Sequence, residues 1–200
     1  NVEIFTEGKT DAEIISHAFK VITDDETPYW SIQSCRRASI TSGGATELAK
    51  LLESIAPKLS IENDKSKIII GIFDNDAKGN QEFNGLRDNL FTNITNRIKK
   101  HIEENIFAMK LPIPNDMDMY LQDKQEFRFF SIEHYFPLDY LKEHNMVKET
   151  SIKGVFEIKG TKTKFASTIQ KSFNEQLFLD FRWLFDEIDH ITNQETKYTI

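Results

Sequence analysis

The sequence predicts an α/β protein, with a mainly parallel sheet flanked by helices and followed by an α-rich C-terminal extension. Up to about residue 114, short apolar runs alternate with segments whose apolar residues recur at helical spacing, which is typical of a parallel sheet. The run "KIIIGIF" at 67–73 is apolar without alternation, as expected for a central strand covered on both faces. Beyond Asp116, aromatic and helical segments replace this pattern. We therefore expect a core at 1–125 and an extension at 126–200, packed as one compact unit.

The elements of the core follow one another as strand, turn and helix. The expected strands cover residues 2–8, 29–35, 67–73 and 106–114. Helices are expected at 10–22, within 41–59 after a Ser/Gly-Gly entry, within 80–90 after a loop, and at 94–104. Thr10 should cap the first helix, with Asp11 in its first turn. Because right-handed crossovers connect parallel strands, the carboxyl ends of the strands should lie at one rim of the sheet.

The extension differs from the core in its aromatic content. Residues 126–137 are expected to be extended before a short helix, and residues 154–173 to form a strand, a basic turn and a helix. An amphipathic helix at 175–188 closes the pattern. The sixteen phenylalanines of the chain supply ample material for a core.

Composition excludes several classes of protein. No apolar run approaches the length of a membrane-spanning helix, and no signal-peptide pattern opens the chain. The single cysteine, Cys35, excludes a disulfide framework and a cysteine-based zinc site, which fits a cytoplasmic protein. The net charge of −7 argues against a broadly basic surface that coats nucleic acid, although an enzyme can still place acids around metal ions. The chain begins inside an expected strand without a methionine, so we expect it to be a piece of a longer protein.

Four acidic residues follow two of the expected strands. Glu7 and Asp11 lie in "EGKTD" after the first strand, and Asp74 and Asp76 lie in "DND" after the central strand. Residues two apart in a strand point to the same side, so both aspartates should face one spot beyond the strand end. Two carboxylates placed in this way repel each other unless a cation lies between them. Plainer alternatives stay open: Asp11 starts a helix with Thr10, Glu7 is a solvated loop residue, and "DND" caps the next helix.

The four carboxylates together suit a divalent metal site. Mg²⁺ and Mn²⁺ prefer hard oxygen ligands, and Mg²⁺ keeps several of its waters. A pair of such ions can activate a nucleophile and stabilise the leaving oxygen of a phosphodiester. The pattern therefore favours a phosphodiester hydrolase that uses two Mg²⁺ or Mn²⁺ ions.

The order of these acids resembles the Toprim domain, the metal-binding module of topoisomerases, bacterial primases and several nucleases. That family carries a glutamate after one strand and a DxD after another, which correspond to Glu7, Asp74 and Asp76. "KLPIP", "FSIEHYFP" and the basic "KGTKTKFA" ahead of "FRWLFDEID" further resemble the C-terminal nuclease region of the OLD (overcoming lysogenisation defect) family. The resemblance spans essentially the whole chain and implies a Rossmann-like core with an extension that completes the site. It also implies an upstream or partner ATPase domain, assembly of copies through the missing part, a DNA substrate and a role in antiviral defence.

Side chains of the extension are candidates for completing this site. Ser131 and Glu133 are two apart on a segment expected to be extended, so both could face the metal ions; alternatively, Ser131 caps a helix. The resemblance implies an active-site lysine from the basic turn, and we favour Lys164 over Lys162 because a buried-looking "FA" follows it. The alternative is that this turn is a solvated run of charge. His134 is expected to pack beside its aromatic neighbours.

The predicted function is a metal-dependent endonuclease that acts on DNA. Its expected catalytic residues are Glu7, Asp74, Asp76 and Lys164, its expected metal ligands are Glu7, Asp11, Asp74, Asp76, Ser131 and Glu133, and its expected nucleic-acid contacts are Arg36, Arg37 and Lys162. A phosphatase of the haloacid dehalogenase type is one alternative, but that family places Thr or Val where this chain has Lys78. A receiver-like or interaction domain, in which Mg²⁺ only orders a surface, is the other alternative.

Overall fold

The chain forms two compact units in a computed structural model that describes residues 1–24, 27–35, 44–62, 66–122 and 127–193. The first unit comprises Asn1–Ala12 and Pro28–Leu111, and the second comprises Glu13–Thr27 and Pro112–Ile200. The sequence predicted one compact unit with an internal boundary at residue 125. The observed division falls at Leu111 instead, and most of the first helix groups with the C-terminal unit.

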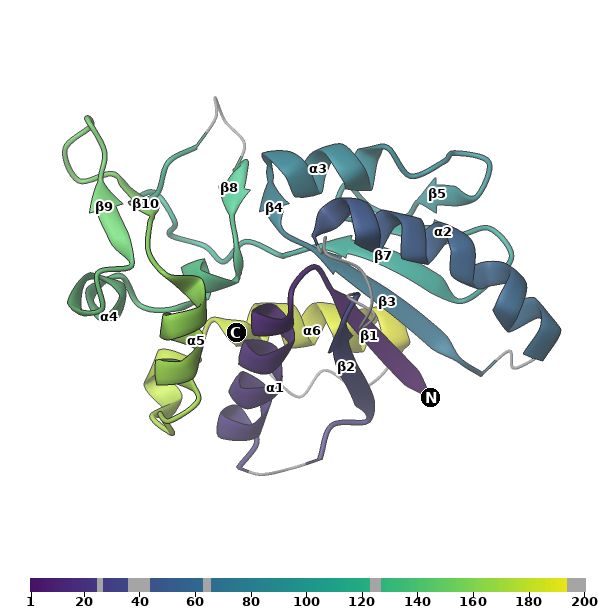
Figure 1. Cartoon of the computed structure of the whole chain (residues 1–200), viewed down its shortest axis with the longest axis horizontal. Helices are drawn as coiled ribbons and strands as arrows, with labels where there is room; N and C mark the ends of the chain where they lie inside the picture. The colour runs from purple at the N-terminus through teal and green to yellow at the C-terminus, as the bar shows by residue number, and fades with distance from the viewer. Residues whose placement is uncertain (25–26, 36–43, 63–65, 123–126, 194–200) are drawn as a thin grey trace. The chain divides into compact units, whose positions relative to one another are not determined.

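A six-stranded sheet organises the first unit, in the order β2-β1-β3-β7-β6-β5 (Figure 1). Its strands are β1 (Val2–Thr6), β2 (Trp30–Ser34), β3 (Ile68–Phe73), β5 (Phe91–Asn93), β6 (Ile98–His101) and β7 (Ile106–Lys110). The first four strands of that order pair in parallel, and the last two are antiparallel to their neighbours. The predicted α/β architecture, a mainly parallel sheet flanked by helices, is therefore confirmed.

The predicted helix at 94–104 is wrong, because this part of the chain forms β6 and the turn that leads into it. The turn is closed by the N–H groups of Ile94 and Thr95, which both donate to the carbonyl oxygen of Ile98. Strand β6 then pairs Ile98 with Met109 of β7. Pairing with β6 satisfies backbone groups that β7 would otherwise expose at a sheet edge. This stabilisation comes from a contact between separate segments, so local helical propensity does not predict it.

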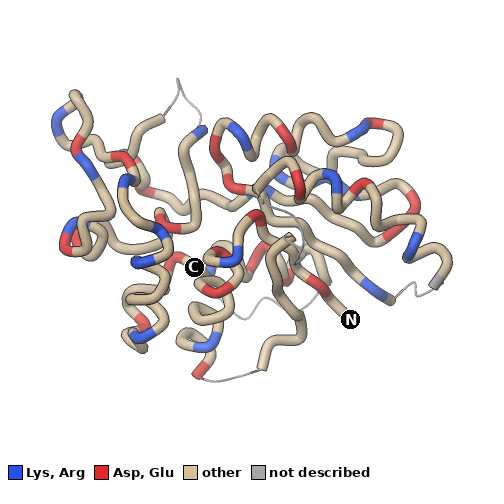
Figure 2. The backbone as a smooth tube through the Cα atoms, viewed as in Figure 1, with Lys and Arg blue, Asp and Glu red and all other residues tan. Residues whose placement is uncertain are grey.

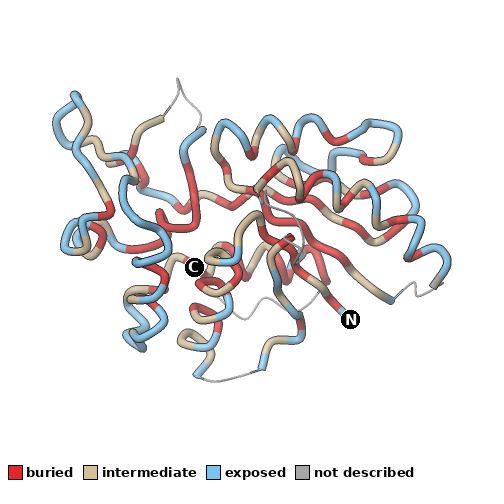
Figure 3. The backbone as a smooth tube through the Cα atoms, viewed as in Figure 1, coloured by how far each residue is buried: buried red, intermediate tan, exposed pale blue. Residues whose placement is uncertain are grey.

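Helices α2 (Ala45–Glu62) and α3 (Ala77–Asn84) pack on one face of the sheet (Figure 1). Buried side chains of α2 such as Leu48 and Leu52 form one hydrophobic cluster with Ile69 and Phe73 of β3. A Cβ at Gly71 would lie 2.6 Å from Leu52 Cδ1, so the missing side chain lets α2 approach the central strand closely. Figure 3 shows the resulting burial along the central strands.

The second unit is built from helices, short strands and a large aromatic cluster. Its elements are most of α1 (Lys9–Ile22), then β8 (Phe129–Phe130), η1 (Ile132–Tyr135), α4 (Leu138–Glu143), β9 (Val147–Glu149), β10 (Phe156–Ile158), α5 (Lys162–Ile169), η2 (Glu175–Leu177) and α6 (Phe181–Thr192). Phe136 lies at the centre of the cluster, with ring centroids 5.2–5.6 Å from Phe165, Phe178 and Phe181. The aromatic richness of the predicted extension is thus the core of a separate unit.

Helix α1 begins at Lys9, so Thr10 lies inside the helix and the predicted cap at Thr10 is wrong. The helix groups with the second unit because its side chains contact that unit. The rings of Phe19 and Phe185 lie 5.3 Å apart, and His17 Nε2 lies 2.7 Å from the carbonyl oxygen of Ser172.

Among the described residues, no helix is long and apolar enough to cross a membrane.

Candidate functional site

Glu7 and Asp74 lie together at the carboxyl ends of two neighbouring strands. Strands β1 and β3 pair in parallel, with Thr6 opposite Ile72, so both chains reach the same rim of the sheet. Glu7 Oε1 accepts a hydrogen bond of 3.0 Å from the backbone N–H of Asp74, and both residues are half-buried. This contact sets Glu7 apart from the solvated loop residue that was one alternative. The order of strands and acids in the sequence predicts this juxtaposition.

Asp76 has a structural role at the start of α3. The short strand β4 (Asn75–Asp76) ends in the cap of this helix, where Asp76 Oδ1 accepts a 2.7 Å hydrogen bond from the N–H of Gly79. Helix α3 spans Ala77–Asn84, so it begins and ends earlier than the loop and helix predicted at 80–90. The capping alternative describes the local geometry of Asp76 well, and capping through one carboxylate oxygen is compatible with metal ligation through the other.

Gly79 is required by the way the chain folds back on Asp74. A Cβ at this position would lie 2.0 Å from the carbonyl oxygen of Asp74, closer than any real side-chain contact. The first turn of α3 is thus packed directly against the backbone of the aspartate turn, residues 74–76. Only glycine permits this approach without displacing the backbone that carries the two aspartates.

Three further polar side chains hold the aspartate turn in place, and the sequence interpretation did not include them. The Asn75 amide donates to the carbonyl oxygen of Leu111 at 3.2 Å. Asn80 Nδ2 donates to Asn75 Oδ1 at 3.0 Å and to the carbonyl oxygen of Asp76 at 2.8 Å, and Lys110 Nζ donates to Asn80 Oδ1 at 2.9 Å. Lys110 could have been found, because it ends β7 directly beside the end of β3. The two asparagines carried no comparable signal, since Asn is common in any turn.

Asp11 lies in the first turn of α1 and closes the turn after Glu7. Its Oδ2 accepts a hydrogen bond of 3.0 Å from the N–H of Gly8, which orders "EGKTD". The backbone of Glu7 is also held, because its carbonyl oxygen accepts from the N–H of Gly44 at 3.0 Å. Both acidic turns are therefore fixed by hydrogen bonds within the first unit.

The donor set determines which ion the acidic turns could hold. Among the residues that the structure describes, no group of three or more His, Cys, Asp or Glu side chains is arranged to bind a metal ion. Mg²⁺ commonly uses only one or two carboxylates and completes its coordination with water and substrate phosphates. Glu7 and Asp74 fit that kind of binding, which does not require a cage made of protein ligands alone.

Ser131, Glu133 and Lys162 form a second polar group, within the second unit. The Ser131 hydroxyl donates to Glu133 Oε2 at 2.6 Å, and Lys162 Nζ lies 3.2 Å from the same oxygen. Ser131 is the cap residue directly before η1 (Ile132–Tyr135), so the prediction of an extended segment through Glu133 is wrong and the capping alternative is closer to the structure. The two residues are brought together by the tight turn of the 3₁₀ helix.

The carboxylate of Glu133 is almost completely removed from water. Its side chain is 1% exposed, whereas that of Lys162 is 45% exposed. A buried carboxylate without polar partners is costly, and the hydroxyl of Ser131 and the ammonium group of Lys162 are the partners that compensate its burial. Lys162 is the first residue of α5, while the favoured Lys164 is exposed two residues further on. The contact with Glu133 thus distinguishes Lys162 from Lys164, whereas the sequence alone could not distinguish them.

His134 is part of the aromatic packing and is poorly suited to act as a base. The centroid of its ring lies 4.9 Å from that of Phe130, on which it stacks, and 4.6 Å from that of Tyr120, which it meets edge-on. Its Nδ1 lies 3.0 Å from the backbone N–H of Ser131, which donates to it. Burial lowers the pKa of His134 to about 4, so the imidazole is neutral at pH 7 and its acceptor atom is already occupied.

Cys35 is equally unsuited to nucleophilic chemistry. Its thiol is buried and lies 3.5 Å from the carbonyl oxygen of Glu7. Burial raises the pKa of this thiol, which opposes formation of a thiolate.

The predicted nucleic-acid contacts Arg36 and Arg37 lie outside the residues that the structure describes.

Comparison of the chain with protein-family models, with curated proteins and with solved structures found no match.

Proposed function

We propose that the protein is a divalent-metal-dependent nuclease that hydrolyses phosphodiester bonds in DNA. The observation that carries the proposal is the hydrogen bond from the backbone N–H of Asp74 to the Glu7 carboxylate, at the ends of two adjacent parallel strands. In open α/β sheets, ligands bind outside the carboxyl ends of the strands, which is where these two carboxylates lie. The order of Glu7 and of "DND" is also the basis of the resemblance to Toprim nucleases of the OLD type. The ATPase partner, the cytoplasmic setting and the antiviral role remain parts of the same proposal.

Glu7 and Asp74 are the proposed metal ligands of the first unit, and Asp76 and Asp11 are proposed to contribute an oxygen each. The ions would supply a nucleophile at neutral pH and neutralise charge on the phosphate. In the reaction, a water oxygen bonds to phosphorus, the bond from phosphorus to the departing sugar oxygen breaks, and that oxygen takes a proton. The residues of the chain orient the phosphodiester and keep the carboxylates in place. Ligation by Ser131 and Glu133 stays a prediction.

Lys162 is the better candidate for the lysine that the sequence interpretation assigned to Lys164. Its ammonium group is held beside the buried Glu133 carboxylate, which restricts its position. A cation held in place by the protein stabilises charge that develops on a transferring phosphate at little reorganisation cost. A lysine that is held by no such contact would lose more side-chain entropy when it meets a phosphate.

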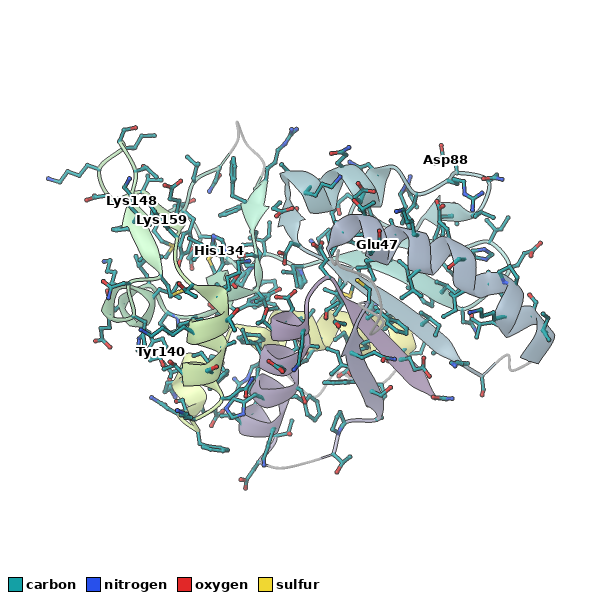
Figure 4. All side chains as sticks on the ribbon, viewed as in Figure 1. Glu47, Asp88, His134, Tyr140, Lys148 and Lys159 are labelled. Carbon is teal, nitrogen blue, oxygen red and sulfur yellow. The ribbon has the colours of Figure 1, made fainter. Side chains whose placement is uncertain are left out.

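The first experiment measures cleavage of duplex DNA with Mg²⁺ or Mn²⁺, with EDTA as a control. Glu7→Gln and Asp74→Asn should each reduce the rate by roughly a hundredfold or more while circular dichroism shows an unchanged fold. The same variants should weaken Mn²⁺ binding measured by calorimetry, a readout that does not depend on turnover. Asp88→Asn is the matched control, because Asp88 is an exposed aspartate of the same unit and is distant in sequence from both acidic turns (Figure 4).

Several results would contradict the proposal. Cleavage that persists in EDTA, or that survives Asp74→Asn, would remove the metal site from the mechanism. Release of phosphate from small phosphomonoesters without DNA cleavage would favour the phosphatase alternative. Mn²⁺ binding without any hydrolysis would favour the non-catalytic domain.

The two lysines are compared in single-turnover cleavage. Lys162→Ala should slow cleavage more than Lys164→Ala, and Lys162→Arg should recover part of the loss. The opposite order would return the role to Lys164. Equal, small losses in both alanine variants would leave the basic turn as solvated charge.

A further inference from the structure

The hairpin formed by β9 and β10 carries three exposed lysines that the proposed chemistry does not use. Lys148 lies in β9 and Lys159 directly after β10 (Figure 4), and Lys153 lies in the loop between the strands. All three are exposed, and among the described residues none forms an ion pair with a carboxylate. These three residues are called the hairpin lysines below.

The hairpin lysines lie in a basic segment of an acidic protein. Between Val147 and Lys171 the chain has six lysines and two glutamates, whereas the whole chain has a net charge of −7 (Figure 2). One of these glutamates, Glu149, is engaged locally, because its Oε1 accepts a hydrogen bond from the N–H of Gly154. The segment thus has a net charge of +4, from six lysines and two glutamates, and Glu157, the second glutamate, lies opposite Lys148 in the hairpin.

The hairpin is a fixed scaffold for this charge. Its strands pair Lys148 with Glu157 and continue to the bond from the N–H of Lys159 to the carbonyl oxygen of Met146, 2.7 Å long. Gly154, at φ +81°, closes the loop that carries Lys153. The hairpin is also tied to its own unit, because the N–H of Phe156 donates to the carbonyl oxygen of Met119 at 2.7 Å.

Stability of the fold does not account for the hairpin lysines. Exposed charges without a partner contribute little to folding, and like charges close together repel each other. In α5, Lys162 compensates the buried carboxylate of Glu133, whereas the hairpin lysines form no ion pair with a carboxylate of the described residues. Charged residues without a role in folding are typical of a functional surface.

We propose that the hairpin lysines form a nucleic-acid-binding surface that contacts phosphates of the DNA backbone. The inference rests on the proposed function only for the choice of DNA as the polyanion. Three lysines on one rigid hairpin offer point charges that neutralise successive phosphates and release counterions. Such contacts position a duplex without reading its sequence.

A membrane surface suits the hairpin less well. Proteins that lie on anionic lipid commonly combine basic residues with a broad apolar face that enters the bilayer. The hairpin exposes a single large apolar side chain, Ile152, which is 57% exposed at the loop. The charge without an apolar face favours a soluble polyanion.

The test measures binding of the full chain to a labelled duplex in EDTA, so that cleavage and metal binding do not contribute. The triple variant Lys148→Gln, Lys153→Gln, Lys159→Gln should weaken binding by roughly tenfold or more near 0.1 M salt. The slope of log K against log salt should fall in magnitude by about two to three, roughly one per lost phosphate contact. The matched control removes three exposed lysines outside the segment, Lys20→Gln, Lys50→Gln and Lys58→Gln, and should leave the slope nearly unchanged.

The outcomes separate this inference from the nuclease proposal. Equal affinity and equal salt slope in the two triple variants would overturn the inference, and so would a wild-type chain that does not bind DNA. Binding to phosphatidylserine vesicles that is lost in the hairpin variant, without a change in DNA binding, would also overturn it and assign the surface to a membrane. Salt-dependent DNA binding through the hairpin would support it even if Asp74→Asn left cleavage unaffected, a result that would overturn only the nuclease proposal.

Discussion

Exchange of His134 for asparagine should remove a pH-dependent contribution to the stability of the second unit. The imidazole is 2% exposed, stacks on Phe130 and accepts the backbone N–H of Ser131. Burial is the main cause that lowers the pKa of His134, from 6.5 to about 4, and the neighbouring Glu133 carboxylate opposes it only in part. The nearby Lys162 ammonium lowers the pKa further.

The sign of the effect follows from proton binding in the two states. Between about pH 4 and pH 6.5 the unfolded chain binds a proton at this histidine that the folded chain does not bind. The free energy of unfolding should therefore fall as the pH is lowered through this window, with a slope approaching about 1.4 kcal/mol per pH unit. Over the whole window the loss amounts to about 3 kcal/mol, and it is absent above pH 6.5 and complete below pH 4.

Urea unfolding between pH 4.5 and 7.5 measures the effect. In a Trp30→Phe background, Trp183 of α6 is the only tryptophan and its fluorescence reports the second unit. His134→Asn keeps an acceptor for the N–H of Ser131 but has no titrating group. The difference in unfolding free energy between wild type and this variant should change by about 2–3 kcal/mol across the pH range, because the wild type becomes more stable relative to the variant as the pH rises.

The control variant and the refuting result both test whether burial of the His134 imidazole causes the pH dependence. His144→Asn removes a partly exposed histidine of the same unit and is the control for the loss of an imidazole outside the buried site. A constant difference between wild type and His134→Asn at all pH values would refute the reasoning. It would mean that the imidazole is as easily charged inside the aromatic cluster as in the unfolded chain.

Three further predictions concern the first unit. Gly79→Ala would place a Cβ 2.0 Å from the Asp74 carbonyl oxygen, and should lower unfolding free energy by about 2–4 kcal/mol in urea titrations; an unchanged midpoint would contradict this close packing. Gly71→Ala should destabilise by about 1–3 kcal/mol because its Cβ would overlap Leu52, and Leu52→Val in the same chain should recover part of the loss; strictly additive effects would argue against the contact. Asn80→Ala should weaken Mn²⁺ binding measured by calorimetry, because the Asn80 amide donates two hydrogen bonds to the aspartate turn, and Asn80→Asp should weaken it too, because a carboxylate cannot donate them. Wild-type affinity in the alanine variant would show that the aspartate turn keeps its geometry without Asn80.

Local pattern determined the elements whose signal lies within a few residues. The apolar run at 67–73 and the helical spacing at 45–59 predicted β3 and α2, because both elements bury continuous apolar surface. The strand-to-acid order also predicted that Glu7 and Asp74 would meet, since parallel strands end at one rim. The helix predicted at 94–104 failed for the opposite reason. Strand β6 forms because it pairs with β7, and a pairing between separate segments is not visible in local helix or strand propensity.

The sequence by itself determined the α/β class, the central strand, and the two acidic turns at the carboxyl ends of β1 and β3, because each depends on periodicity and on the order of elements along the chain. Only the tertiary structure decided that Asp76 caps α3, that Asn80 and Lys110 hold the aspartate turn, and that Lys162 and not Lys164 contacts Glu133. It also decided that α1 groups with the C-terminal residues. These features depend on hydrogen bonds and ring contacts between segments far apart in the chain, and their energies become available only once the backbone has brought the partners within reach.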